Sequence, residues 1–210
     1  NFTGFKIPLL GLGTWRLAGD ECTRVVSQAI EIGYRHIDTA DIYENHLAVG
    51  NALARFDRSS LFVTSKVPHA QLACDDLIAT CERNLEQLQL DYLDMYLLHW
   101  PNADIPMEET FAALKSLHDA GKVRSIGVSN FIIQRFAEAI DISELPICTN
   151  QVEFHPLLYQ DELLDFCHSR DILITAYAPL ARTEALRNSV IEAVAAEVGK
   201  TPAQVCLRWL

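Results

Sequence analysis

The feature that most constrains the fold of this chain is a regular alternation of short apolar runs with segments of helical periodicity. Runs rich in β-branched and aromatic residues predict six strands, at residues 35–38, 61–66, 93–99, 123–128, 147–152 and 172–177, and an earlier strand is expected near residues 9–13. Parallel strands need long crossover connections, which are usually helices. The alternation therefore predicts an α/β fold with a parallel sheet.

The helical pattern is clearest over residues 75–88. Five apolar residues share one face of that segment: Leu77, Ile78, Cys81, Leu85 and Leu88. Asp75 stands where an N-terminal capping residue is expected. The segment is predicted to be an amphipathic helix capped by Asp75.

Three later helices are marked by apolar stripes or by the residues at their ends. Phe111, Leu114 and Leu117 form one stripe, and Gly121 is placed to end that helix. The next stripe and the glycine after it are Val190, Ile191, Val194, Val198 and Gly199. Thr201-Pro202-Ala203-Gln204 is typical of a capping box with proline at the first helical position, so a final helix begins there.

Two architectures contain such an alternation, an open doubly wound sheet and a closed β/α barrel. The stretch Gly11-Leu-Gly-Thr-Trp-Arg16 fails the G-x-G-x-x-G dinucleotide fingerprint, because arginine occupies the third glycine position. The strands recur at intervals close to the ~30 residues of one barrel unit. We therefore predict a single (β/α)8 TIM barrel domain over residues 1–210 that lacks its last strand and C-terminal segment. An eighth strand is expected beyond Leu210, and without it the first and seventh strands would be exposed edges.

The charge balance and the cysteines narrow the classes of partner and compartment. The chain has 17 basic and 28 acidic residues and a formal net charge of −11, which disfavours nucleic acid and anionic membrane surfaces. No run approaches the ~20 apolar residues that span a bilayer, so we expect a soluble, cytoplasmic protein. The six cysteines form no C-x-x-C pair and match no zinc spacing, which indicates a reducing compartment and no metal.

Polar residues follow several of the predicted strands at the point where each strand ends. In chain order they are Asp38, Lys66, His99, Ser129, Asn130, Gln151 and Tyr177. Taken alone, each has an ordinary explanation: an aspartate caps a turn, a lysine is a surface charge, and His99 or the nearby Tyr43 fills a loop. Barrel enzymes, however, place their catalytic groups at the carboxyl ends of the strands, which face one common mouth. The convergence of these residues therefore predicts an active site.

Six motifs carry a resemblance to a known family. They are Gly-Tyr-Arg-His-Ile-Asp-Thr-Ala (33–40) with Tyr43, Val-Thr-Ser-Lys (63–66), Asp-Tyr-Leu-Asp-Met-Tyr-Leu-Leu-His-Trp-Pro (91–101), Ile-Gly-Val-Ser-Asn-Phe (126–131), Asn-Gln-Val-Glu-Phe-His-Pro (150–156) and Ala-Tyr-Ala-Pro-Leu (176–180). In this order, and over about residues 11–210, they resemble the aldo-keto reductases. Within that family the chain is most similar to the microbial 2,5-diketo-gluconate and methylglyoxal reductases.

The resemblance implies a catalytic set of Asp38, Tyr43, Lys66 and His99. Carbonyl reduction needs a hydride, which a nicotinamide cofactor supplies, and a proton, which Tyr43 would supply. A free phenol has a pKa of about 10, and the Lys66 ammonium would lower it, with Asp38 as the countercharge. His99 would orient the carbonyl through a hydrogen bond, as the neutral imidazole.

The same resemblance implies the ligand contacts. The expected cofactor-binding residues are Thr14, Trp15, Asp38, Ser129, Asn130, Gln151, Tyr177 and Leu180, and the expected substrate-binding residues are Trp15, Tyr43, His99 and Trp100. Ser129, Asn130 and Gln151 would hold the nicotinamide carboxamide, and Tyr177 would stack on the ring. NADPH is the expected cofactor, with NADH as the alternative. The expected partner is a small-molecule carbonyl, and the complete protein is expected to be a monomer.

Two alanines depart from the family pattern, which often has serine and glycine where this chain has Ala178 and Ala181. Ala178 lacks a hydroxyl for the cofactor phosphates, and the Cβ of Ala181 disfavours a positive φ. Arg182 is the expected substitute contact for a phosphate. The family's basic segment that grips the adenosine phosphate follows the eighth strand, as does its C-terminal substrate loop, and neither lies within these 210 residues.

Two other functions compete on the same barrel. One is a non-catalytic cofactor-sensing or partner-binding protein, which the potassium-channel β subunits resemble. The other is an aldolase that uses Lys66 as a Schiff base. A barrel fold by itself decides nothing, because barrels host many chemistries. The complete set of four catalytic residues favours the reductase.

Overall fold

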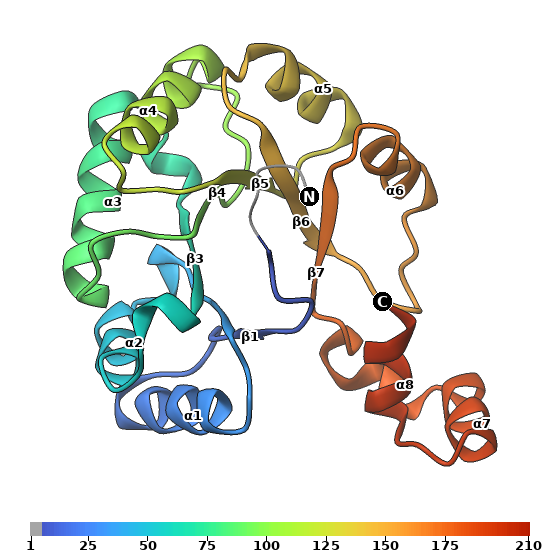
Figure 1. Ribbon diagram of the computed structural model, residues 1–210. Coiled ribbons are helices and arrows are strands. Elements are labelled where there is room, and N and C mark those ends of the chain that lie inside the picture. The colour runs from blue at the N-terminus through green and yellow to red at the C-terminus, as the bar shows by residue number, and fades with distance from the viewer. Residues whose placement is uncertain (1–5) are drawn as a thin grey trace. The chain divides into compact units, whose positions relative to one another are not determined.

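The computed structural model describes residues 6–210, and the chain separates into two compact units, residues 1–148 and 149–210. Figure 1 traces the chain through the elements of both units. Five of the seven strands among residues 6–210 lie in the first unit, and β6 begins two residues before the boundary.

The first unit alternates strands with helices in chain order. Its strands are β1 (Gly11–Gly13), β2 (His36–Asp38), β3 (Phe62–Val67), β4 (Met95–Leu98) and β5 (Ile126–Ser129). Its α-helices are α1 (Gly19–Glu31), α2 (His46–Leu53), α3 (Cys74–Leu88), α4 (Met107–Asp119) and α5 (Ile133–Ile142), and its 3-10 turns are η1 (Asp41–Tyr43), η2 (Arg58–Ser60) and η3 (His69–Gln71). Each strand pairs in parallel with the next, β1 with β2 through β4 with β5.

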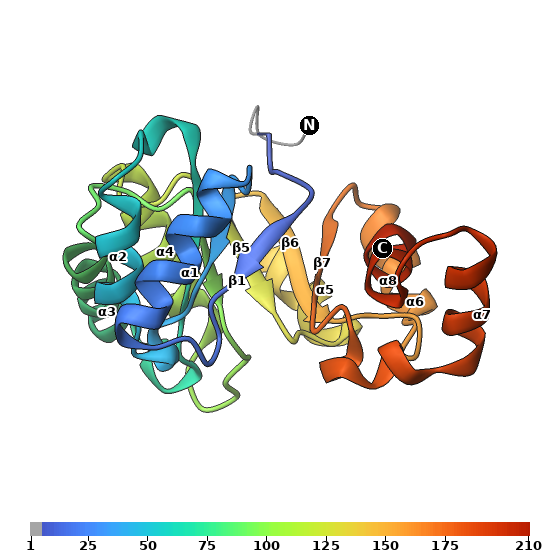
Figure 2. The same ribbon diagram turned by 90° about the horizontal axis from the view of Figure 1, so that it is seen from below.

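Helices cover the outer side of the strands in the first unit. Neighbouring helices pack in chain order, α1 beside α2, α2 beside α3 and α3 beside α4, as Figures 1 and 2 show. Every residue of β3, β4 and β5 is buried, as expected for a parallel sheet with both faces covered. The close approach of α2 to α3 depends on Gly50, because a Cβ there would lie 2.7 Å from the carbonyl oxygen of Leu88.

The second unit contains two paired strands and three helices. They are β6 (Ile147–Glu153), α6 (Asp161–His168), β7 (Leu173–Tyr177), the 3-10 segment η4 (Ala181–Arg187), α7 (Ser189–Glu197) and α8 (Pro202–Trp209). β6 and β7 pair in parallel over five residues, with Gln151 opposite Thr175. A small apolar core forms where η4 meets α7 and α8, from Ala181, Ala185, Ile191 and Cys206, with Leu180 packed against it.

All seven predicted strands are confirmed, with bounds that differ by a few residues. Their succession with helices is that of a (β/α)8 barrel without its eighth strand. The capping box at Thr201 is also confirmed, and Gly121 and Gly199 both have positive φ just after their helices. Among residues 6–210, no helix combines the length and the apolar character that crossing a bilayer requires.

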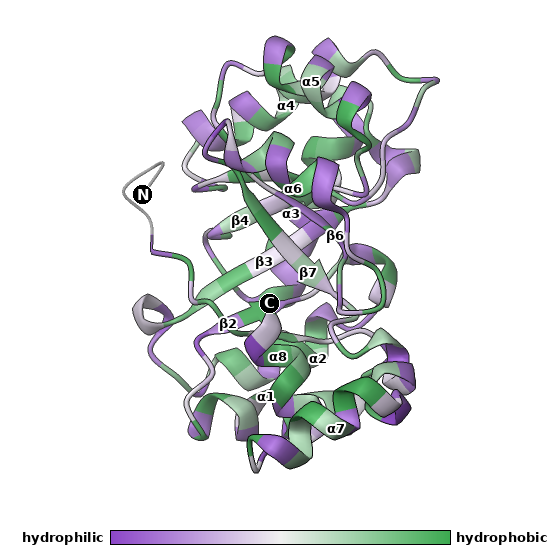
Figure 3. Ribbon diagram, turned by 90° about the vertical axis from the view of Figure 1, so that its right-hand side faces the viewer, coloured by the Kyte–Doolittle hydropathy of each residue, from purple (hydrophilic) through white to green (hydrophobic). Residues whose placement is uncertain are grey.

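Two helix predictions were wrong in detail. Asp75 does not cap α3: the capping position is Ala73, and Asp75 lies in the first turn, where its charge favours the helix dipole. The stripe predicted on α7 is also not a buried face, because Val190, Val194 and Val198 are exposed while Ile191 is buried. Hydrophilic and hydrophobic residues share this short helix, as Figure 3 shows, so periodicity alone did not identify its inner face.

Candidate active site

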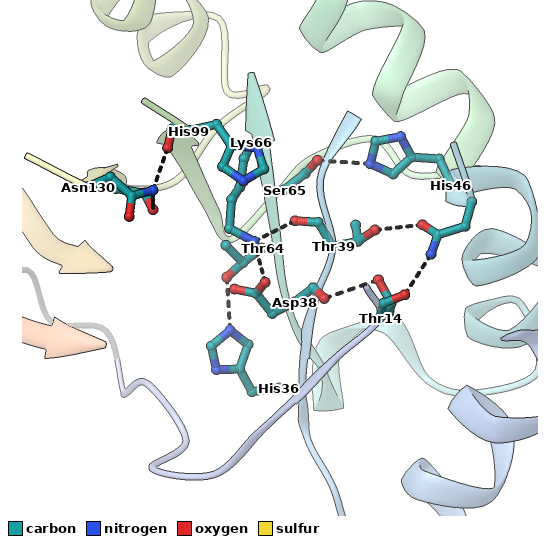
Figure 4. A network of polar contacts seen from close by, with 12 residues as sticks. Thr14, His36, Asp38, Thr39, His46, Thr64, Ser65, Lys66, His99 and Asn130 are labelled. Carbon is teal, nitrogen blue, oxygen red and sulfur yellow. Dashed lines mark hydrogen bonds and ion pairs between the residues drawn. The ribbon is translucent and has the colours of Figure 1, made fainter. Parts of the chain in front are cut away.

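A buried lysine is the centre of the polar site in the first unit. The Lys66 side chain is 1% exposed, and its ammonium donates to the carboxylate of Asp38 and, over 3.0 Å, to the carbonyl oxygen of Thr39. Figure 4 shows the ammonium group between these two acceptors. A buried ammonium is tolerated only with a countercharge and hydrogen bonds, and the end of β2 provides both.

Strand register brings these residues together. Asp38 ends β2 and pairs with Thr64 of β3, so that Lys66, two residues further along, points to the same face. His99 directly follows β4 and is aligned by its backbone amide, which donates to the carbonyl oxygen of Val67 over 3.0 Å. The carboxyl ends of three adjacent parallel strands therefore bring a carboxylate, an ammonium and an imidazole to one place.

Tyr43 reaches the same place from a short turn. It ends η1, directly after β2, and its ring centroid lies 5.3 Å from Lys66 Nζ and 5.8 Å from the His99 ring centroid. The two rings meet edge to face, at an interplanar angle of 79°. The structure thus brings together all four residues that the sequence predicted as catalytic.

Opposing effects act on the pKa of Tyr43. Burial raises this pKa and is the largest effect, and the Asp38 charge raises it further, while the charge and hydrogen bond of Lys66 lower it. The lowering by Lys66 agrees with the prediction, but burial outweighs it, so the net direction is upward. The phenol therefore stays protonated at neutral pH, as a proton donor must.

His99 is a neutral imidazole at neutral pH. Burial, followed by the charge of Lys66, lowers the pKa of His99 from 6.5 to about 4. Its Nδ1 is buried and has no hydrogen-bond partner among residues 6–210. A buried polar atom without a partner costs free energy, so this ring is suited to meeting a polar ligand atom.

The end of β5 adds a hydroxyl and an amide. The side-chain nitrogen of Asn130 donates to the carbonyl oxygen of His99 and to Ser129 Oγ, both over 3.0 Å. Asn130 has φ +63°, a left-handed conformation that asparagine tolerates better than most residues. These contacts fix Ser129 and Asn130 beside His99.

Sequence reasoning missed the residue that ties the surrounding loops together. Asn45 is buried, accepts a hydrogen bond from Thr39 Oγ1 over 2.9 Å, and donates to the carbonyl oxygens of Thr14 and Leu17. Thr14 in turn donates from its backbone amide to the carbonyl oxygen of Asp38 over 2.9 Å. No sequence motif marks Asn45 as a buried residue, and only the fold shows its contacts.

The other predicted site residues are divided between the two units. Trp15 and Trp100 follow β1 and β4 and are about half exposed, and the Arg16 guanidinium lies 4.2 Å from the Trp15 ring centroid. Within the second unit, Gln151 is buried on β6, and Tyr177 is the last residue of β7. Leu180 packs against the apolar core of that unit.

The loop after β7 has an unusual backbone. Ala178, Ala181, Arg182 and Thr183 all have positive φ, between 49° and 84°. This conformation costs free energy in a residue with a Cβ, and Ala181 adopts it although its Cβ was expected to disfavour it. The Arg182 guanidinium pairs with the Glu153 carboxylate over 3.3 Å, so the expected phosphate contact would compete with an ion pair.

The side chains of the first unit fit a nicotinamide carboxamide. A carboxamide donates and accepts hydrogen bonds, and the end of β5 presents a hydroxyl from Ser129 and an amide from Asn130. The unpartnered Nδ1 of His99 adds a polar atom close by. The donor set is therefore of the right chemistry for this group.

The chain is similar to known proteins of one family. The profile of the Aldo/keto reductase family matches residues 9–210. The chain is 43% identical over 209 residues to the glyoxal reductase of Bacillus subtilis (strain 168), covering 98% of this chain and 75% of the relative. It is 41% identical over 209 residues to the methylglyoxal reductase DkgB of Yersinia pestis, covering 97% of this chain and 78% of the relative.

A solved structure has the same fold. The crystal structure of a protein provisionally described as a 2,5-diketo-D-gluconic acid reductase B matches with a TM-score of 0.96 and 41% identity, over 100% of this chain and 75% of that one. The match confirms the predicted (β/α)8 barrel lacking its last strand.

Proposed function

Because the chain belongs to the aldo/keto reductase family and is an NAD(P)H-dependent oxidoreductase acting on aldehydes or ketones, we propose that NADPH is its reductant and that Tyr43 is its proton donor. The observation that carries the proposal is the convergence of Asp38, Tyr43, Lys66 and His99 at adjacent strand ends. The proposed preference for NADPH over NADH rests on family resemblance alone.

Ser129 and Asn130 would hold the nicotinamide carboxamide, and the bound nicotinamide would supply a hydride to the carbonyl carbon. Gln151 and Tyr177, in the second unit, stay predicted cofactor contacts, as do Thr14, Trp15, Asp38 and Leu180. Trp15 and Trp100 stay predicted walls of the substrate site. Their half-exposed rings offer apolar surface to a small carbonyl compound.

Proton transfer is assigned to Tyr43. As the carbonyl carbon gains the hydride, the electron pair of the C=O π bond moves to oxygen, and the phenol O–H protonates that oxygen. The phenolate left behind is stabilised by the nearby Lys66 ammonium. Asp38 holds that ammonium in place through their ion pair.

His99 orients the substrate as a neutral hydrogen-bond partner. Its low pKa keeps it uncharged at neutral pH, so it does not compete with Tyr43 as the acid. Hydrogen bonds that are already oriented toward the carbonyl oxygen stabilise charge as it develops there. Two groups with different roles therefore meet one oxygen.

The aldolase alternative fits this geometry less well. A Schiff base requires the neutral amine of the lysine to attack a carbonyl carbon. The Lys66 ammonium is engaged by Asp38 and by the carbonyl oxygen of Thr39 and is almost fully buried, which leaves its nitrogen poorly accessible to a carbonyl carbon. The ion pair supports an electrostatic role.

The direct test is turnover of a carbonyl panel by the full-length protein. The panel contains glyoxal, methylglyoxal, an aromatic aldehyde and a simple ketone, each with NADPH and with NADH, followed by the cofactor's absorbance. We expect reduction of at least one aldehyde, and tighter binding of NADPH than of NADH in a direct titration. Absence of turnover across the panel would contradict the proposal, and equal affinities would remove the NADPH preference.

A further inference from the structure

The turn that carries Tyr43 has little to hold it in place by itself. η1 is a single 3-10 turn of three residues, closed by hydrogen bonds from Tyr43 N to Ala40 O and from Glu44 N to Asp41 O. Its N-terminal capping residue makes no side-chain hydrogen bond, and Glu44 has φ +54°, a left-handed conformation that costs free energy. The position of Tyr43 must therefore be fixed by contacts from outside the turn.

One such contact comes from helix α3. Asp41, the first residue of η1, accepts hydrogen bonds at Oδ1 from Asn84 Nδ2 over 2.6 Å and from Arg83 Nη2 over 2.9 Å. The Asp41 side chain is 17% exposed and its contact with Asn84 is partly buried, whereas the Arg83 side chain is 43% exposed. Both contacts hold the start of the turn against α3, two residues before Tyr43.

The same network continues to the strand that carries Lys66. Asn84 Oδ1 accepts a hydrogen bond from Ser65 Oγ over 3.3 Å, and Ser65 Oγ is 2.9 Å from His46 Nε2, at the start of α2. Successive residues of a strand point to opposite faces, so Ser65 faces the helices while Lys66 faces Asp38. Figure 4 shows Ser65 and Lys66 diverging in this way.

We propose that Asp41 is a positioning residue for the carbonyl reduction, which fixes the Tyr43 turn to α3 and, through Asn84 and Ser65, to the strand of Lys66. The inference rests on the proposed role of Tyr43. Among residues 6–210 the Asp41 carboxylate is hydrogen-bonded to Arg83 and Asn84 and to no member of the proposed catalytic set, so it has no direct chemical role. Its effect is on the distance between the phenol and the ammonium, which a displacement of about 1 Å would spoil.

The test compares Asp41→Ala and Asp41→Asn with the wild-type full-length protein. The measurements are kcat and KM for the best carbonyl of the panel, the NADPH dissociation constant, the melting temperature, and the isotope effect with deuterated cofactor. Asp41→Ala should lower kcat by about 10- to 100-fold, raise the isotope effect, and leave NADPH affinity unchanged. Asp41→Asn keeps the oxygen that accepts from Asn84 and should recover most of the turnover.

Asp119→Ala is the matched control, because it removes an aspartate whose ion pair with Lys115 lies within α4 and far from Tyr43 in the chain. Its kcat should equal that of the wild type. Wild-type kcat in Asp41→Ala would overturn the inference, and so would a fall that merely follows a lower melting temperature. If Asp41→Ala does not fold, Arg83→Met replaces it and should lower kcat, because it removes one of the two contacts of Asp41 with α3, and wild-type kcat in Arg83→Met would overturn the inference.

A parallel Tyr43→Phe variant separates the two proposals. If the wild type reduces no carbonyl, or if Tyr43→Phe retains full turnover, the proposed function fails. If both behave as proposed and the Asp41 variants keep wild-type kcat, only the positioning role fails.

Discussion

Tyr43, His99 and Lys66 have different protonation states at the site, and burial and charge set them. Burial raises the pKa of Tyr43 and lowers that of His99, which keeps the phenol protonated and the imidazole neutral. The Lys66 ammonium shifts both pKa values downward, because a positive charge disfavours a second one and favours a phenolate. Burial and the Lys66 ammonium together therefore keep His99 neutral, and the same ammonium favours proton release from Tyr43.

Replacement of Lys66 by methionine tests this division. Lys66→Met preserves the length of the side chain and removes its charge, so the pKa of Tyr43 should rise further and Asp38 should lose its ion pair. We expect turnover to fall by about 100-fold or more, the scale of a damaged general acid. Steady-state kinetics across neutral and alkaline pH measures this, and an unchanged kcat would contradict the role given to Lys66.

At the residue scale, the sequence predicted the groups at strand ends and, through the family resemblance, Tyr43, but it missed Asp41 and Asn45. Asp38, Lys66 and His99 were predictable, because short apolar runs locate the ends of the strands. Asp41 and Asn45 were not, because their partners come from other elements: α3 for Asp41, and the ends of β1 and β2 for Asn45. Only the packed structure shows these contacts.

At the scale of elements, the two ends of the strands in the first unit have different tasks. The carboxyl ends carry the candidate active site, whereas a cluster around Asp94 joins the amino ends of β3, β4 and β5. Asp94 accepts hydrogen bonds from Arg58 Nη2 over 2.6 Å and from the backbone amide of Val63 over 2.8 Å, and lies 3.5 Å from Arg124 Nη1. Both guanidinium groups stack on Tyr92, 4.0 and 3.5 Å from its ring centroid.

Disrupting this cluster should lower the stability of the fold and leave the catalytic groups in place. Asp94→Ala would leave the Val63 amide and the Arg58 guanidinium without their carboxylate, and a buried donor left without its acceptor costs about 1 to 3 kcal/mol. The free energy of unfolding from urea titration measures the effect. Asp119→Ala, which breaks an exposed ion pair, is the control and should change stability far less. Equal changes in the two variants would contradict the assignment.

The buried face of a helix could be predicted from its apolar periodicity only where the helix was long. The alternation located all seven strands. The stripe predicted on α4 is buried, and that on α3 is buried except for the half-buried Ile78, because these helices have 13 and 15 residues. The nine-residue α7 was too short for its stripe to decide which face is buried. The positive φ of Ala178, Arg182 and Thr183 had no signal in the sequence, since none of them is glycine or asparagine.

At the scale of the molecule, buried histidines link stability to pH. Burial lowers the pKa of His46 and of His99 from 6.5 to about 4, and lowers that of His36 as well. All three lie in the first unit, and His36 and His46 are hydrogen-bonded to Thr64 and Ser65 of β3. Between pH 6.5 and about 4 the unfolded chain binds protons at His46 and His99 and the folded chain does not.

The free energy of unfolding should therefore fall as the pH drops from about 6.5 to about 4. Each of His46 and His99 contributes up to about 3 kcal/mol to that loss. His46→Gln offers an amide donor to Ser65 without titrating, so the slope of stability against pH should be shallower in this variant. Denaturant titrations at several pH values measure both slopes, and identical slopes would contradict the neutral, buried state of His46.

The central claim is that Tyr43 donates the proton in carbonyl reduction, and Tyr43→Phe tests it most directly. This change deletes one oxygen and leaves the ring that packs against His99. In the purified full-length variant, NADPH affinity should be retained, because the expected nicotinamide contacts come from other residues. Turnover of the best aldehyde should fall by about 10²- to 10⁴-fold, the range expected for loss of a general acid. Wild-type turnover with intact cofactor binding would contradict the claim.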